Sequence, residues 1–119
     1  MYHIYFYEDR NGNSPVYNWI KELSGRKGKD AGIQLQKVND YLTILQHKGL
    51  SAGEPFIKHL TGEIWELRPI RNRILFAAWR RDGFVLLHHF LKQTRKTPQR
   101  EIDRAQKALN DLREREGTE

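Results

Sequence analysis

Basic residues stand at the ends of three short apolar runs between residues 63 and 98, and they are the side chains best suited to chemistry. Arg68, Arg73 and Lys92 are the basic residues at these ends, and a carboxylate, Glu66, lies inside the first run. Guanidinium and ammonium groups bind phosphate oxygens, arginine through two parallel hydrogen bonds. We therefore expect a site that binds a phosphate group.

The positive charge of the chain is concentrated in the same stretch. The net charge is +6, and residues 58–100 hold ten Lys or Arg against three Asp or Glu, a balance of +7. Residues 1–57 carry +1 and residues 101–119 carry −2. A localised basic field is typical of proteins that bind polyanions. Further phosphate contacts are expected from Lys58, Arg71, Arg95 and Lys96, whose alternative role is ordinary solubility.

Three apolar runs predict the strands that position these residues. Runs of Ile, Leu, Val, Phe and Trp, bounded by Pro69, Asn72 and the Asp82-Gly83 turn, are typical of an antiparallel meander that ends in a tight hairpin. Residues 2–7 alternate aromatic and β-branched side chains and predict a first strand, which we expect to be an inner or a well-covered strand.

Two helices are predicted between the first strand and the meander, and a third after it. The first begins at Ser14-Pro15, the second ends at Gly49, and the third begins at Thr97-Pro98. Residues 50–57 are expected to form a loop, and the chain from Arg113 onward is expected to fray. The apolar stripes are Val16, Trp19, Ile20 and Leu23; Leu35, Val38, Leu42 and Leu45; and Ile102, Ala105, Leu109 and Leu112.

The order β-α-α-β-β-β-α predicts an α+β domain. We expect a small antiparallel sheet with the helices, including the two of the N-terminal half, on one face. The other face would then be left for a ligand.

Strand alternation decides which candidates can share a face of the sheet. It places His88 and Lys92 together, along with Leu86 and Phe90, and it places His89 on the opposite face. Lys92 is predicted to contact phosphate by electrostatic attraction, and its alternative is a strand-end lysine that protects a sheet edge. His88 is either catalytic or a buried histidine whose hydrogen bonds are satisfied.

Three roles stay open for Glu66, which shares a face with Arg68: a proton acceptor, an orienting partner for an arginine, or a simple ion pair. Arg68 and Arg73 flank one turn from opposite strands, so they can bind the same phosphate or can be solvated strand-end arginines. Trp65 and Trp79 are interpreted as core residues, with base stacking as the alternative.

Length and composition narrow the class of protein. A chain of 119 residues fits one domain over 1–119, and the absence of cysteine excludes disulfides and thiol chemistry. The start of the chain has no basic leader, and no run approaches the roughly 18 apolar residues of a membrane span. We expect a cytoplasmic protein. The sequence has no metal-ligand spacing and no glycine-rich nucleotide loop, so no cofactor is expected.

Four motifs resemble those of HigB-like toxins of the RelE/ParE superfamily, in the same order and spacing over nearly the whole chain. They are Trp65-Glu-Leu-Arg68, Arg73-Ile-Leu-Phe-Ala77, Leu86-Leu-His-His-Phe-Leu-Lys92 and Lys96-Thr-Pro98. The chain departs from the family motif at two positions, with His89 where Gly or Ala is usual and Gln93 where a second Lys is usual.

The resemblance implies a toxin of a type II toxin–antitoxin system that cleaves messenger RNA on the ribosome without a metal. In such cleavage the ribose 2′-hydroxyl attacks the adjacent phosphorus, and Glu66, Arg68, Arg73, His88 and Lys92 become the candidate catalytic residues. It also implies a helix-turn-helix, HigA-like antitoxin as partner, with operator DNA bound only through that antitoxin, and no membrane. The superfamily includes gyrase inhibitors of the ParE type, so a binding protein without nuclease activity is the alternative.

Overall fold

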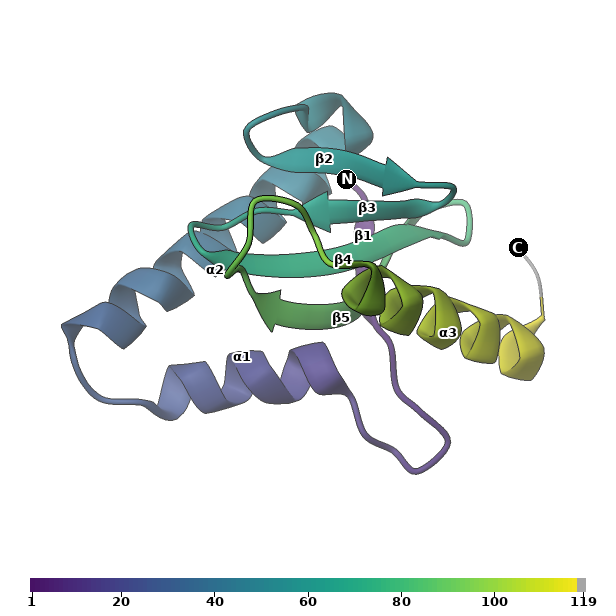
Figure 1. Cartoon of the computed structure of the whole chain (residues 1–119), viewed down its shortest axis with the longest axis horizontal. Coiled ribbons are helices and arrows are strands. Elements are labelled where there is room, and N and C mark those ends of the chain that lie inside the picture. The colour runs from purple at the N-terminus through teal and green to yellow at the C-terminus, as the bar shows by residue number, and fades with distance from the viewer. Residues whose placement is uncertain (118–119) are drawn as a thin grey trace.

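The computed structural model describes residues 1–117 and has a mixed five-stranded sheet between two layers of helices (Figure 1). The strand order is β1-β5-β4-β3-β2. The α+β class predicted from the sequence is confirmed. The elements are β1 His3–Phe6, α1 Pro15–Gly25, α2 Lys29–Lys48, the short 3₁₀ helix η1 Gly49–Ala52, β2 Ile57–Thr61, β3 Ile64–Leu67, β4 Asn72–Trp79, β5 Gly83–Leu91 and α3 Gln99–Glu116.

The predicted meander is present as β3, β4 and β5, and the sheet has two features that the sequence did not predict. A further strand, β2, pairs antiparallel with β3 at one edge. β1 forms the other edge and runs parallel to β5, so its expected inner position is wrong. The prediction failed because aromatic and β-branched residues in a strand indicate packing on the faces of a sheet. They do not indicate how many strands lie beside it. Gly83 permits this pairing, because a Cβ there would lie 2.1 Å from the His3 carbonyl oxygen.

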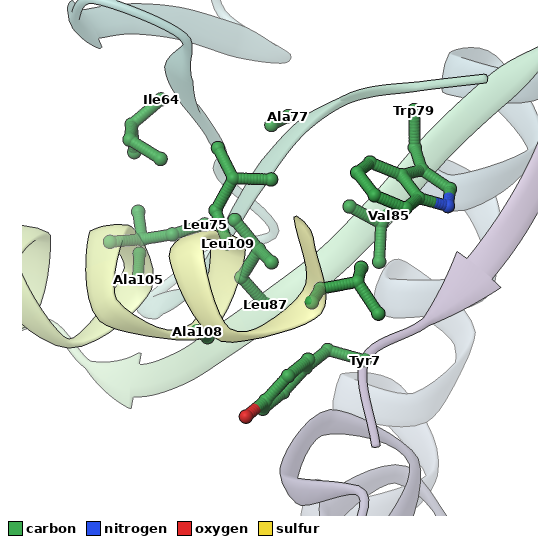
Figure 2. Packing of buried hydrophobic residues seen from close by; sticks show 11 residues of the cluster. Tyr7, Ile64, Leu75, Ala77, Trp79, Val85, Leu87, Ala105, Ala108 and Leu109 are labelled. Carbon is green, nitrogen blue, oxygen red and sulfur yellow. The ribbon is translucent and has the colours of Figure 1, made fainter. Parts of the chain in front are cut away.

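Helices cover both faces of the sheet. α1 and α2 pack on one face, over a core that includes Ile74 and Phe76. α3 packs on the other face, where Ala105 and Leu109 lie against Leu75 and its neighbours (Figure 2). The expectation that all helices share one face is therefore wrong. Burial of a leucine side chain of α3 against the sheet stabilises the fold by about 2 kcal/mol.

Helix boundaries follow the predicted signals in α1 and α2 but not in α3. Thr97 does not cap α3, because its hydroxyl donates a hydrogen bond to Glu66, and the helix begins at Gln99. The chain does not fray at Arg113 as expected, since α3 continues to Glu116 and Arg113 pairs with Glu63. The last two residues of the predicted tail, 118–119, lie outside the described residues. Within the described part, no helix is long and apolar enough to cross a membrane.

A β-bulge in β5 changes the predicted alternation. Leu75 pairs with His88 while the next residue, Phe76, pairs with Leu86, so Leu87 is an extra residue in β5. Leu86 accordingly belongs to the core under α1 and α2, whereas Leu87 belongs to the core under α3. The predicted face shared by Leu86 and His88 is therefore wrong.

Candidate phosphate-binding site

A cavity of about 200 Å³ lies at the end of the sheet where α3 begins, and we call it the basic cavity. Its walls come from β2, from β3 and the residue after it, from the first turn of α3, and from the loop between β5 and α3. Figure 1 shows this loop as the green segment that turns back across the sheet. Six of the nine predicted site residues line it: Lys58, Glu66, Arg68, Lys92, Arg95 and Lys96. His59, Leu60, Thr97 and Ile102 complete the lining.

Glu66 forms the floor of the basic cavity and is only 2% exposed. Its Oε1 lies 3.5 Å from Nε of Arg68 and 3.7 Å from Nε of Arg73, and its Oε2 accepts a hydrogen bond from Thr97. A buried carboxylate is costly unless it is paired and hydrogen-bonded, and here both oxygens are engaged. Of the three predicted roles, this geometry favours an orienting partner for the two arginines.

Arg68 and Arg73 lie close together, as their positions around the turn predict, but at different depths. Arg68 lines the basic cavity with 22% of its side chain exposed, whereas Arg73 is 7% exposed and does not line it. Nη1 of Arg73 donates to the carbonyl oxygens of Ile70 and Asn72, each at 2.8 Å. Arg73 thus binds the turn between β3 and β4 from beneath.

The buried position of Arg73 also shifts the pKa of its guanidinium group. Burial lowers the pKa of Arg73 from its ordinary value, the nearby Glu66 carboxylate opposes this, and the positive charge of Arg68 adds to it. Glu66 therefore offsets part of the cost of burying the guanidinium group.

Four cations surround the mouth of the basic cavity without an acidic partner. Lys58, Arg95 and Lys96 are exposed, Lys92 is half-buried, and within residues 1–117 none of the four forms an ion pair. Arg68, by contrast, also contacts Glu54 at 3.2 Å. Unpaired cations around one small hollow attract an anion, and each contact with a phosphate adds salt-sensitive affinity.

Besides Arg73, two predicted site residues lie outside the basic cavity. His88 bonds through Nε2 to Oε1 of Glu101 at 2.7 Å, and this contact joins β5 to α3. His88 is 16% exposed in its side chain and fits the interpretation of a buried histidine with a satisfied partner. Arg71 lies on the other side of the sheet end, in a different cavity. Neither side chain therefore lines the basic cavity.

Three residues that the sequence analysis did not select take part in these contacts: His59, Thr97 and Glu101. Thr97 was interpreted as a helix cap, and its hydroxyl instead bonds to Glu66. Nothing in the spacing of Glu101, in the first turn of α3, connects it with His88 thirteen residues earlier. Thr97 meets Glu66, and Glu101 meets His88, because the loop after β5 and the start of α3 fold back over the sheet.

His89 points to the opposite face from His88, as predicted, and is packed among neutral groups. Its ring stacks on Trp19 with centroids 3.5 Å apart, and Nε2 lies 3.1 Å from Oδ1 of Asn72. Burial, aided by the nearby His88 and opposed by Glu101, lowers the pKa of His89 to about 4. The imidazole is therefore neutral at physiological pH.

Acid is expected to destabilise the protein through His89. Because the pKa of His89 is about 4 in the folded protein and about 6.5 in the unfolded chain, the unfolded chain takes up the proton first as the pH falls. The stability contributed by the neutral ring is complete above about pH 6.5 and is lost towards pH 4, by up to about 3 kcal/mol.

Urea unfolding across this pH range measures the effect of His89. His89→Gln should flatten the dependence, whereas His47→Gln, at an exposed position of α2, should leave it unchanged. Equal slopes in the wild type and His89→Gln would contradict the assignment.

An α+β fold with this order of helices around a mixed five-stranded sheet is consistent with the topology of RelE-like proteins. The chain belongs to the family described as "Phage derived protein Gp49-like (DUF891)", which is part of the RelE/ParE toxin-like group and matches residues 18–110. Among curated proteins, none matches this sequence significantly.

Proposed function

We propose that this protein is the toxin of a type II toxin–antitoxin system and that it cleaves messenger RNA on the ribosome, as its resemblance to HigB-like toxins implies. The supporting observation is the basic cavity, which is lined by the unpaired Lys92, the half-buried Arg68 and the buried Glu66 that contacts Arg68. At about 200 Å³ it is smaller than the roughly 300–1,000 Å³ of ordinary small-molecule sites. A segment of nucleic-acid backbone, which needs no enclosure of its bases, suits such a site.

The chemistry assigns different work to these residues. The 2′-hydroxyl gives up its proton to water when its oxygen bonds to phosphorus, and the 5′-oxygen takes up a proton from water when its bond to phosphorus breaks. Between these two events, negative charge builds on the phosphoryl oxygens. Lys92 and Arg68 stabilise this charge, and donors already in place are effective because they need no reorganisation during the reaction. Glu66 positions Arg68, and Arg73 holds the adjoining turn. Lys58, Arg95 and Lys96 bind neighbouring phosphates.

A helix-turn-helix antitoxin of the HigA type is the proposed partner, and operator DNA would be bound only through it. Inhibition of gyrase, as by ParE-type members of the group, is the competing outcome for a fold that hosts more than one activity.

Mapping of messenger 5′ ends by primer extension, after induction of the protein in cells, tests the proposal. Cuts at positions in phase with codons are expected, and they should disappear when the reporter carries no start codon. Intact messages together with growth arrest would overturn the proposed nuclease activity. A DNA-damage response would indicate gyrase as the target instead.

A further inference from the structure

A second cavity, of about 430 Å³, lies at the same end of the sheet but on the face covered by α1 and α2. We call it the turn pocket, because the turn between β3 and β4 forms one side of it. Its lining residues are Trp19, Arg26, Asp30, Ile33, Gln34, Ile70, Arg71, Asn72, His89 and Leu91. The proposed phosphate chemistry uses none of its side chains for a reaction, and its volume is within the range of ligand sites.

The turn pocket contains flat rings and an ordered chain of amides. The imidazole of His89 and the indole of Trp19 are stacked at an interplanar angle of 13°. Asn72, which is 4% exposed, contacts His89 through Oδ1 and donates from Nδ2 to Gln34 at 3.2 Å. Gln34 in turn donates to Asp30 at 2.7 Å. Amide groups fixed in this way offer donors and acceptors to the edge of a heteroaromatic ring.

Three large apolar side chains around the turn pocket are left exposed to solvent. Ile33 is 47% exposed, Leu91 46% and Ile70 45%. Ile70 also has a φ of +59°, a left-handed conformation that is costly for a β-branched residue. Strain of this kind persists where the surrounding structure imposes it, and it is frequent at ligand-binding positions. Apolar side chains beside fixed amides suit a planar ligand with polar edges.

Two contacts connect the turn pocket to the basic cavity. The guanidinium of Arg73 donates to the carbonyls of Ile70 and Asn72 in the pocket, and its Nε faces Glu66 in the cavity floor. The backbone N–H of Lys92, a cavity residue, donates to the carbonyl of Arg71, a pocket residue, at 2.7 Å. One turn therefore borders both hollows, and a chain that crosses the end of the sheet can enter both.

We propose that the turn pocket binds a nucleobase of the same RNA strand whose phosphate occupies the basic cavity. This inference rests on the proposed function, since it requires RNA as the substrate. The stacked neutral rings and the border that the pocket shares with the basic cavity favour a nucleobase over an apolar helix of a protein partner, because a base joined to a bound phosphate lies beside it. Arg26 and Arg71 at the pocket add attraction for the phosphates beside that base.

The test measures binding of a fluorescent tetranucleotide, made with 2′-deoxy sugars so that it cannot be cleaved, by anisotropy. Ile33→Ala and Leu91→Ala should each weaken binding roughly five- to tenfold, in line with the loss of one base contact. An abasic nucleotide at one position should weaken binding to the wild type by a similar factor, and should add no further loss in the two variants. Leu50→Ala, which changes an apolar residue 38% exposed and outside the pocket, is the matched control.

Failures of the two proposals give different results in this experiment. If Ile33→Ala and Leu91→Ala bind like the wild type while Lys92→Ala binds weakly, the turn pocket does not hold a base and the basic cavity still binds RNA. A loss that is the same for intact and abasic probes also overturns the inference. If the wild type does not bind the tetranucleotide, the inference is overturned, and the proposed cleavage on the ribosome is decided separately by primer extension. If the two variants lose affinity only for a co-purifying antitoxin, the pocket is a protein-docking surface and the inference is overturned.

Discussion

Lys92→Ala should lower the rate of messenger cleavage by about 100-fold or more, because removal of one donor that stabilises transition-state charge typically costs that much. Arg68→Ala should have a comparable effect, since Arg68 lines the same cavity and is aimed by Glu66. Lys92 is half-buried and forms no ion pair within the described residues, so the melting temperature of Lys92→Ala should change little. Arg68→Ala also removes a positive partner of the buried Glu66, so its melting temperature should be lower. Primer extension at matched protein levels, together with thermal unfolding, measures the two quantities.

Lys37→Ala is the matched control for Lys92→Ala. Lys37 is exposed on α2, far along the chain from the basic cavity, and its removal lowers the net charge by the same amount. It should leave cleavage unchanged. Wild-type cleavage in both Lys92→Ala and Arg68→Ala would contradict the assignment of the basic cavity. An equal loss in Lys37→Ala would show that overall charge, and not the cavity, governs activity.

Arg73→Ala should act mainly on stability, with an expected loss of about 3–5 kcal/mol in the free energy of unfolding. The change leaves Glu66, 2% exposed, with one fewer positive partner, and it removes the two hydrogen bonds that bind the turn carbonyls of Ile70 and Asn72. A loss of toxicity in this variant alone would therefore not identify a catalytic role. Urea unfolding of the purified protein measures the effect.

A second substitution separates the two causes of this destabilisation. Glu66→Gln removes the buried charge, so in the double variant Arg73→Ala should cost less than it does alone. The cost of Arg73→Ala in the wild type minus its cost in the Glu66→Gln background gives the contribution of the ion pair to the free energy of unfolding. The cost that remains in the Glu66→Gln background is due to the lost hydrogen bonds to the turn. If Arg73→Ala alone changed the free energy of unfolding by less than about 1 kcal/mol, the structural role of Arg73 would be wrong.

The composition and periodicity of the chain determined the fold class and most of the basic site. Apolar residues that recur every second position indicate a strand, and those that recur every three or four positions indicate a helix. These patterns correctly predicted α1, α2 and the meander of β3, β4 and β5. Charge is also local information, so the stretch 58–100 could be recognised as the basic part of the chain. Six of the nine candidate residues line one cavity because strand ends that are close in sequence stay close in a meander.

Only the tertiary structure decided how deep each residue lies and which distant residues it meets. Arg68 and Arg73 both flank the same turn, yet one lines the basic cavity and the other is buried. Arg73 lies in β4, which has β3 and β5 on its two sides, whereas Arg68 follows the end of β3. The bulge at Leu87 shifts the alternation of β5, and nothing in a smooth apolar run indicates an inserted residue. The pairs Thr97 with Glu66 and Glu101 with His88 form because burial of the apolar stripe of α3 brings the chain back over the sheet. Such contacts depend on the packing of the whole chain, which local sequence patterns do not encode.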